Sequence, residues 1–139
     1  MLNSGTDEII GFTNGCFDIL HVGHLRLFQF IKENCDVLVV GIDSDRRVKE
    51  LKGRTRPINS EKDRALMLES LANIDRVYIF DSEDALTTLV KNINPDLMVV
   101  GADYKNKRVV GSEHAKKIIF FEKVNEYSTT NIIQRLASG

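Results

Sequence analysis

Hydrophobic residues occur along the chain in short continuous runs rich in valine and isoleucine, and polar residues do not alternate with them. Continuous apolarity is typical of strands that are covered on both faces, as in a parallel sheet flanked by helices. We therefore predict five buried strands, at residues 9–13, 37–40, 76–80, 97–100 and 118–121.

Segments with helical periodicity lie between these runs. In the first of them, Leu25, Phe28 and Ile31 recur at three-residue steps and form an apolar stripe. Helices are predicted at residues 24–33, 61–71 and 84–93, and a last one near Ser128. The alternation of strand and helix predicts right-handed crossovers and an α/β fold, a doubly wound, five-stranded parallel sheet of the Rossmann-like type.

Length and composition limit the classes of protein that fit. The chain has 139 residues, 42% of them hydrophobic, which fits a single domain over residues 1–139. Its net charge of -1 provides no global positive field, so neither nucleic acid nor a membrane is an expected partner. The two cysteines show no disulfide or metal pattern and no secretory signal opens the chain, so we expect a cytoplasmic protein.

The most informative motif, TNGCFDILHVGH, runs from the first predicted strand into the first helix, at residues 13–24. Gly15 lets the backbone pass close to a ligand, and His21 and His24 stand near a helix N-terminus that favours an anion. Two alternatives are open, since the pair could be half of a metal site or His21 could cap the helix. A zinc site needs a further ligand, and because His114 is the only other histidine, the motif favours phosphate binding.

Basic residues gather after the second predicted strand. Lys49, Lys52, Arg54 and Arg56 supply charges that can hold phosphate oxygens, and Arg64 lies on the next helix. A solvated surface loop is the alternative, because mixed Lys and Arg segments are usually exposed. The position of the loop beside the carboxyl edge of the sheet favours ligand binding.

Two further segments combine a structural and a binding interpretation. Residues 128–130, Ser-Thr-Thr, are a candidate helix N-cap, and the same geometry presents hydroxyl and N–H groups to an anion. Gly101 and Asp103 follow the fourth predicted strand, where the backbone can contact a base or ribose, although a simple aspartate turn is the alternative.

The strand followed by NGCFDILHVGH resembles the HxGH nucleotidyltransferase superfamily, the cytidylyltransferase-like proteins, which transfer a nucleoside monophosphate from a nucleoside triphosphate. Among its branches, the chain looks most like the adenylyltransferase half of the bifunctional heptose kinase/adenylyltransferases, which join ATP and a heptose 1-phosphate to give ADP-heptose and pyrophosphate. Further matching segments are the basic loop, the segment after the fourth strand and the closing STT signature, at residues 51–64, 101–105, 110–113 and 127–133.

The resemblance implies a role for individual residues. His21 and His24 would stabilise the transition state at the α-phosphate, Lys52 would bridge the reacting phosphates, and Ser128 with Thr129 would hold the leaving pyrophosphate. Nucleotide contacts are implied at Thr13, Asn14, Gly15, Cys16, Phe17, Gly23, Arg64, Gly101, Asp103, Tyr104, Ser128, Thr129 and Thr130.

Acceptor contacts are implied at Asp18, Asp45 and Lys52. Asp18 could instead orient the backbone of the motif, and Asp45 could stabilise the helix that starts there. We do not expect Asp18 to act as a general base, because a phosphate acceptor is already ionised near neutral pH.

The implied substrates are a nucleoside triphosphate with Mg²⁺, for which no direct protein ligand is assigned, and a phosphorylated sugar or polyol supplied by a separate kinase. A homodimer is implied as well.

Residues 123–127 lack the arginine that cytidylyltransferases usually carry before the closing signature, which favours ATP. The alternative is a cytidylyltransferase that uses CTP with glycerol 3-phosphate or a related polyol phosphate. A nucleotide-binding domain without turnover is disfavoured because the catalytic residue types are all present.

Overall fold

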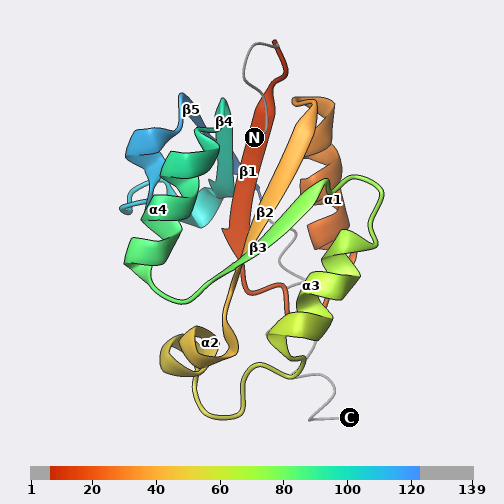
Figure 1. Ribbon diagram of the computed structural model, residues 1–139, viewed down its shortest axis with the longest axis vertical. Coiled ribbons are helices and arrows are strands. Elements are labelled where there is room, and N and C mark those ends of the chain that lie inside the picture. The colour runs from red at the N-terminus through yellow and green to blue at the C-terminus, as the bar shows by residue number, and fades with distance from the viewer. Residues whose placement is uncertain (1–6, 123–139) are drawn as a thin grey trace.

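One parallel sheet organises the chain. The computed structural model describes residues 7–122 (Figure 1). Its strands are β1 (Ile10–Gly15), β2 (Val37–Asp43), β3 (Arg76–Phe80), β4 (Leu97–Gly101) and β5 (Lys117–Phe121), in the spatial order β3-β2-β1-β4-β5. All neighbouring strands pair in parallel. The predicted five-stranded, Rossmann-like α/β fold is confirmed.

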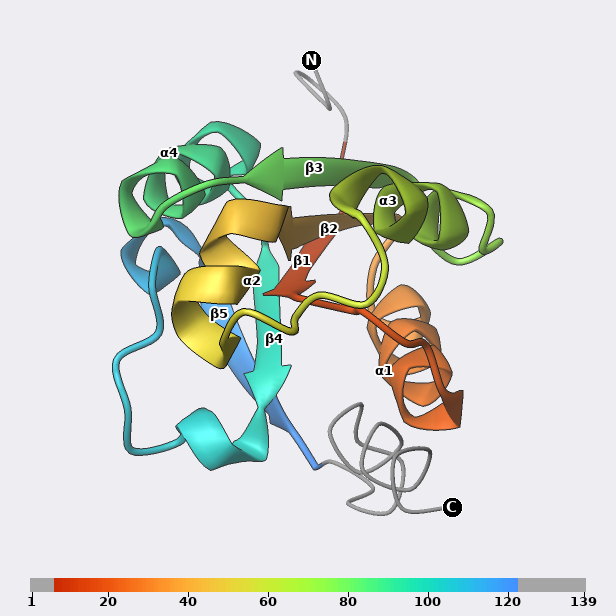
Figure 2. The ribbon, with the colours of Figure 1, turned by 90° about the horizontal axis from the view of Figure 1, so that it is seen from below.

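Helices cover both faces of this sheet. The helices are α1 (Val22–Glu33), α2 (Asp45–Lys52), α3 (Glu61–Glu69) and α4 (Glu83–Ile93), with two short 3₁₀ segments, η1 (Ala102–Tyr104) and η2 (Ser112–His114). Figures 1 and 2 show α1 and α3 on one face, α4 on the other, and α2 beyond the carboxyl ends of the strands. Within residues 7–122, no helix is long and apolar enough to cross a bilayer.

The two-sided cover explains why apolar residues in the strands do not alternate with polar ones. In β2, Leu38 and Val40 belong to the core under α1 and α3, whereas Val39 between them belongs to the core under α4. All three side chains are fully buried. Each face of the strand therefore needs an apolar residue.

Three aspartates fix the amino ends of the strands, opposite the edge where ligands are expected. Asp36 accepts a hydrogen bond from the backbone N–H of Ile9, Asp96 from that of Ile10, and Asp75 from that of Leu38, each at 2.8 Å. The Ile10 hydrogen bond holds the pKa of Asp96 below its usual range. These contacts satisfy backbone donors that the neighbouring strands leave unpaired.

The structure moves several predicted boundaries. β1 begins at Ile10 and continues to Gly15, because Asn14 and Gly15 pair with Gly41 and Ile42 of β2. β2 and β4 likewise continue past their predicted ends, and β5 begins one residue earlier. The first helix begins at Val22, two residues before its predicted start, because His21 caps it. The remaining shifts are small, with α3 ending at Glu69 and α4 beginning at Glu83. The helix predicted near Ser128 lies outside the described residues.

Gly111 brings the segment after η1 against α4. Its φ of +84° is in the left-handed region, and a Cβ atom there would lie 2.8 Å from Cγ2 of the buried Val90. We expect Gly111→Ala to lower the free energy of unfolding by about 1–3 kcal/mol, measured by urea denaturation. The substitution should cost less in a Val90→Ala background, and equal losses in both backgrounds would contradict the steric explanation.

Candidate functional site

A cleft of about 560 Å³ lies at the carboxyl ends of the strands. This is the edge at which open α/β sheets bind ligands, and Figure 2 looks onto it. The predicted site residues that line the cleft are Thr13, Asn14, Gly15, Cys16, Phe17, His21, Gly23, His24, Lys52, Gly101 and Tyr104. Four others, Asp18, Asp45, Arg64 and Asp103, are not part of its lining. Ser128, Thr129 and Thr130 lie outside the described residues.

The two histidines cap α1 reciprocally. Nδ1 of His21 accepts a hydrogen bond from the backbone N–H of Gly23 at 3.1 Å, and Nδ1 of His24 accepts one from the backbone N–H of His21 at 3.2 Å. An imidazole nitrogen that accepts is unprotonated, so each neutral ring carries its proton on Nε2. The capping alternative is therefore correct for His21, and it is compatible with phosphate binding, because both rings line the cleft.

Aromatic packing holds these rings in place. The rings of His21 and His24 are stacked, with centroids 3.8 Å apart and an interplanar angle of 28°. Phe17 meets the His24 ring edge-on, with a centroid distance of 5.3 Å. Phe17 itself has φ of 50°, a left-handed conformation that is rare for a bulky residue. Such strain clusters at functional sites, where surrounding contacts over-determine the backbone.

Asp18 joins the histidine motif to the basic loop. Its side chain is fully buried, and its two carboxylate oxygens accept hydrogen bonds from the backbone N–H groups of Ile58 and Asn59, both at 2.7 Å. The Asn59 side chain donates in return to the Asp18 carbonyl at 2.6 Å. Of the two roles that the sequence left open, the structure favours orienting the backbone over a direct acceptor contact.

Arg64 is a buried tie between segments that are distant in the sequence. Its Nη1 donates to the carbonyls of Cys16 at 2.9 Å and Asp43 at 2.8 Å, and its Nε donates to the Asn59 carbonyl at 3.0 Å. Its Nη2 pairs with Asp45 at 2.8 Å. The side chain is fully buried, and its N–H groups donate to acceptors within the protein. A direct contact of Arg64 with the triphosphate is therefore disfavoured. Because Asp45 is paired with Arg64, a direct contact of Asp45 with the acceptor is disfavoured as well.

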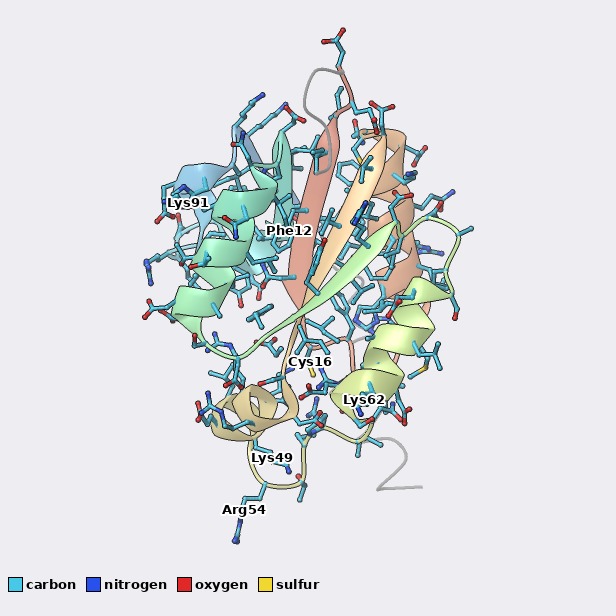
Figure 3. All side chains as sticks on the ribbon, in the orientation of Figure 1. Phe12, Cys16, Lys49, Arg54, Lys62 and Lys91 are labelled. Atoms are coloured by element: carbon cyan, nitrogen blue, oxygen red, sulfur yellow. The ribbon has the colours of Figure 1, made fainter. Side chains whose placement is uncertain are left out.

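Lys52 is the basic-loop residue that reaches the cleft. It ends α2 and lines the cleft, and it forms no ion pair with another residue in the range 7–122. Arg54 points away from the molecule, as Figure 3 shows. The largely buried Arg56 lies beside Asp18, with Nε 3.7 Å from Oδ2. Of the basic residues that the sequence singled out, Lys52 is the one placed to meet a ligand phosphate in the cleft.

Cys16 lines the same cleft, but its thiol is not activated as a nucleophile. Burial raises the pKa of its thiol, and the opposing effects of Lys52 and Arg64 do not cancel that rise. The thiol is therefore protonated near neutral pH, and the thiolate is the reactive form of cysteine. We assign Cys16 to the wall of the cleft.

Two ion pairs in the cleft were not found from the sequence. Nε of Arg47 lies 2.8 Å from Oδ1 of Asp43, and Nη1 of Arg108 lies 3.3 Å from Oε2 of Glu83. All four residues line the cleft. Asp43 ends β2 and Arg47 lies in α2, so the helical i,i+4 rule does not predict the first pair from the sequence. Glu83 and Arg108 have no local signal, because only the fold brings them together.

Asp81 anchors the first turn of α2 to the turn between β3 and α4. Arg46 donates to both of its carboxylate oxygens and to its carbonyl, and the Ser44 hydroxyl donates to Oδ1. These hydrogen bonds, that of Arg46 first, hold the pKa of Asp81 below its usual range. The backbone N–H of Ser44 also donates to the Phe80 carbonyl at 2.9 Å. Two walls of the cleft, α2 and α4, are thus joined by one carboxylate.

Metal ligation is the remaining alternative for the histidine pair. Among residues 7–122, no group of three or more His, Cys, Asp or Glu side chains is arranged to hold a metal ion. The third ligand that a zinc site would need is therefore not found in this part of the chain.

Comparisons with known proteins show the family of the chain. Residues 12–135 match the family described as Cytidylyltransferase-like. The chain is 53% identical to the Bifunctional protein HldE of Campylobacter fetus subsp. fetus over 90% of its length, and 52% identical to that of Nitratiruptor sp. over 93%. It spans only about a quarter of these relatives, 27% and 28% of their length.

A solved structure supports the fold alone. The crystal structure of the lipopolysaccharide core biosynthesis protein from Thermoplasma volcanium GSS1 superimposes with a TM-score of 0.68. The match covers 83% of this chain and 98% of that one at 24% sequence identity. The sheet and its covering helices are therefore shared by two distantly related sequences.

Proposed function

The chain belongs to the cytidylyltransferase-like family and is a nucleotidyltransferase, and from this premise we propose that it transfers AMP from ATP to a heptose 1-phosphate-like sugar 1-phosphate. The products are an ADP-sugar and pyrophosphate. The observation that carries the proposal is the pair of capping histidines, His21 and His24, which line the cleft with their Nδ1 atoms bound to the backbone.

In the proposed reaction, an oxygen of the acceptor's phosphate attacks the α-phosphorus of ATP. The bond from that phosphorus to the oxygen bridging to the β-phosphate breaks, and pyrophosphate leaves on the opposite side with the bonding electrons. The acceptor phosphate is already ionised near neutral pH, so no side chain has to remove a proton. The protein supplies position and charge stabilisation.

The proposal gives the predicted catalytic residues the following roles. The Nε2–H groups of His21 and His24 donate to the α-phosphate oxygens as they gain charge. Lys52 places an ammonium group between the reacting phosphates. Ser128 and Thr129 hold the leaving pyrophosphate, with Thr130 beside them. Mg²⁺ enters with ATP as part of the substrate and neutralises triphosphate charge.

The other predicted contacts divide into direct and indirect ones. Gly101 and Tyr104 line the cleft after β4, where they suit the nucleoside. Asp18, Asp45 and Arg64 act through the loops that they hold.

The acceptor must already carry its phosphate when it binds, so the reaction that precedes this one is phosphorylation of a sugar by a kinase.

The test is a matrix of substrates with inorganic pyrophosphatase present. Each nucleoside triphosphate is incubated with heptose 1-phosphate, other sugar 1-phosphates and glycerol 3-phosphate, and phosphate release is measured together with the nucleotide product. We expect ATP with heptose 1-phosphate to give an ADP-sugar. Turnover of CTP with glycerol 3-phosphate, and none with ATP, would establish the cytidylyltransferase instead. Tight nucleotide binding without turnover of any pair would indicate a binding domain.

A further inference from the structure

The cleft has two ends that differ in charge. At the histidine end, formed by His21, His24 and Lys52, the cationic Lys52 forms no ion pair with the rest of residues 7–122. At the paired end, formed by Asp43, Arg47, Glu83 and Arg108, each guanidinium faces a carboxylate. An unpaired cation suits phosphate oxygens, whereas neutral pairs suit uncharged groups that both donate and accept hydrogen bonds.

Arg47 is held in position with donors to spare. Asp43 accepts from its Nε at 2.8 Å, and the guanidinium carbon lies 5.7 Å from the centroid of the Phe80 ring. Both charged side chains are mostly buried, at 15% and 14% exposure. The Nη1 and Nη2 atoms of Arg47 donate to no other described residue, and Asp43 uses only Oδ1 in this pair. Donors and an acceptor are thus presented side by side in the wall of the cleft.

The rest of the paired end provides a rim and an apolar floor. Glu83 and Arg108 are exposed at 56% and 70%, so their contact is weak and each can turn to a ligand. Phe80 and Leu86 line the same end and are buried, at 3% and 4% exposure. Apolar surface beside paired donors and acceptors suits a sugar, because the C–H faces of a sugar are apolar and its hydroxyls both donate and accept hydrogen bonds.

From this arrangement we infer that the paired end binds the hydroxyl-bearing carbon skeleton of the acceptor sugar, with Asp43 and Arg47 as its main polar contacts. The inference rests on the proposed function for the identity of the acceptor. Glu83 and Arg108 contact the hydroxyls furthest from the phosphate.

Strand order decides between the acceptor and the nucleoside. β4 lies on one side of β1, and β2 and β3 lie on the other. The chain order reverses between β1 and β4, which is where a doubly wound sheet binds a nucleotide. Asp43 ends β2, and Phe80 ends β3. With the α-phosphate at the histidines after β1, Asp43, Arg47 and Phe80 therefore lie on the side that the nucleotide leaves open, and Arg108 reaches Glu83 there from the segment after η1.

The experiment measures binding of heptose 1-phosphate and of inorganic phosphate by calorimetry, in the absence of nucleotide, to the wild type, Asp43→Asn and Glu83→Gln. The control is Glu50→Gln, which makes the same charge change on α2 at an exposed residue outside the cleft lining. We expect the Kd for heptose 1-phosphate to rise about tenfold or more in Asp43→Asn, and less in the rim variant. The Kd for inorganic phosphate and for ATP should stay unchanged in all three variants.

Other outcomes overturn the inference. If the variants weaken ATP and spare heptose 1-phosphate, the paired end holds the nucleoside. If they bind heptose 1-phosphate as the wild type does, or if the wild type binds it no better than inorganic phosphate, there is no sugar subsite. Failure of the proposed function gives a different result, namely no ADP-sugar in the substrate matrix, and the acceptor that the matrix identifies then replaces heptose 1-phosphate in these binding comparisons. Glu83→Gln keeps the test informative if Asp43→Asn does not fold.

Discussion

Replacing His24 with asparagine is expected to leave the fold intact and to lower kcat by about 100-fold or more, the usual effect of removing a donor that stabilises a transition state. The asparagine oxygen can take the place of Nδ1 and accept the hydrogen bond from the His21 backbone, which is 3.2 Å long in the structure. It has no group in the position of Nε2. The variant therefore separates capping from chemistry, measured by pyrophosphate release and by thermal denaturation.

The matched control is His24→Gln, whose amide nitrogen can approach the position of Nε2 while the capping acceptor is lost. It should be less stable than His24→Asn and retain more activity per folded molecule. If His24→Asn turns over like the wild type, the ring of His24 serves only the helix, and the proposed role of the histidine pair is wrong.

Replacing Arg64 with methionine is expected to be the most damaging single change to stability. The substitution leaves Asp45 and the carbonyls of Cys16, Asp43 and Asn59 without the donors that they have now. Breaking a fully buried ion pair costs about 3–5 kcal/mol, and because Asp45 is 34% exposed we expect a loss of about 3 kcal/mol, still a large part of the roughly 5–15 kcal/mol that holds a typical domain together. Urea denaturation measures the loss.

Two further variants serve as controls for the lower free energy of unfolding expected of Arg64→Met. Arg26→Met removes an exposed arginine from α1 and should change stability little. Arg64→Lys keeps the charge but cannot reach all the acceptors, so it should be intermediate in stability, with turnover reduced because the histidine motif is less firmly held. If Arg64→Met lowers the free energy of unfolding no more than Arg26→Met does, the hydrogen bonds of Arg64 contribute nothing to stability.

The sheet was predictable because its signal is local. Runs such as Leu38, Val39 and Val40 are apolar at every position, which only a strand covered on both faces requires. The ends of the elements were not predictable to the residue. Asn14 and Gly15 are poor strand formers, and they are extended because β2 pairs with them.

The site was predictable where its residues are close together in the sequence. His21, Gly23 and His24 are neighbours in one motif, and all line the cleft. The family resemblance implied a nucleotide contact for Arg64, and its partners within the protein could not be seen in the sequence. Its acceptors at Cys16 and Asp43 lie 48 and 21 residues away. The pair of Glu83 and Arg108, 25 residues apart, was missed for the same reason.

The joining of α2 and α4 has a consequence for how such enzymes change their substrates. The carboxylate of Asp81 joins the start of α2 to the turn that precedes α4. The Arg46 pair is exposed and therefore weak, so the pairing of β2 with β3, the strands that lead into these helices, is what sets the gap between them. If the acceptor binds here as inferred, acceptors that differ in length or branching are sorted by the side chains that line the gap. On the proposed function, a change of acceptor would require the exchange of side chains that line the cleft, such as Leu86 or Arg108, and not of the sheet.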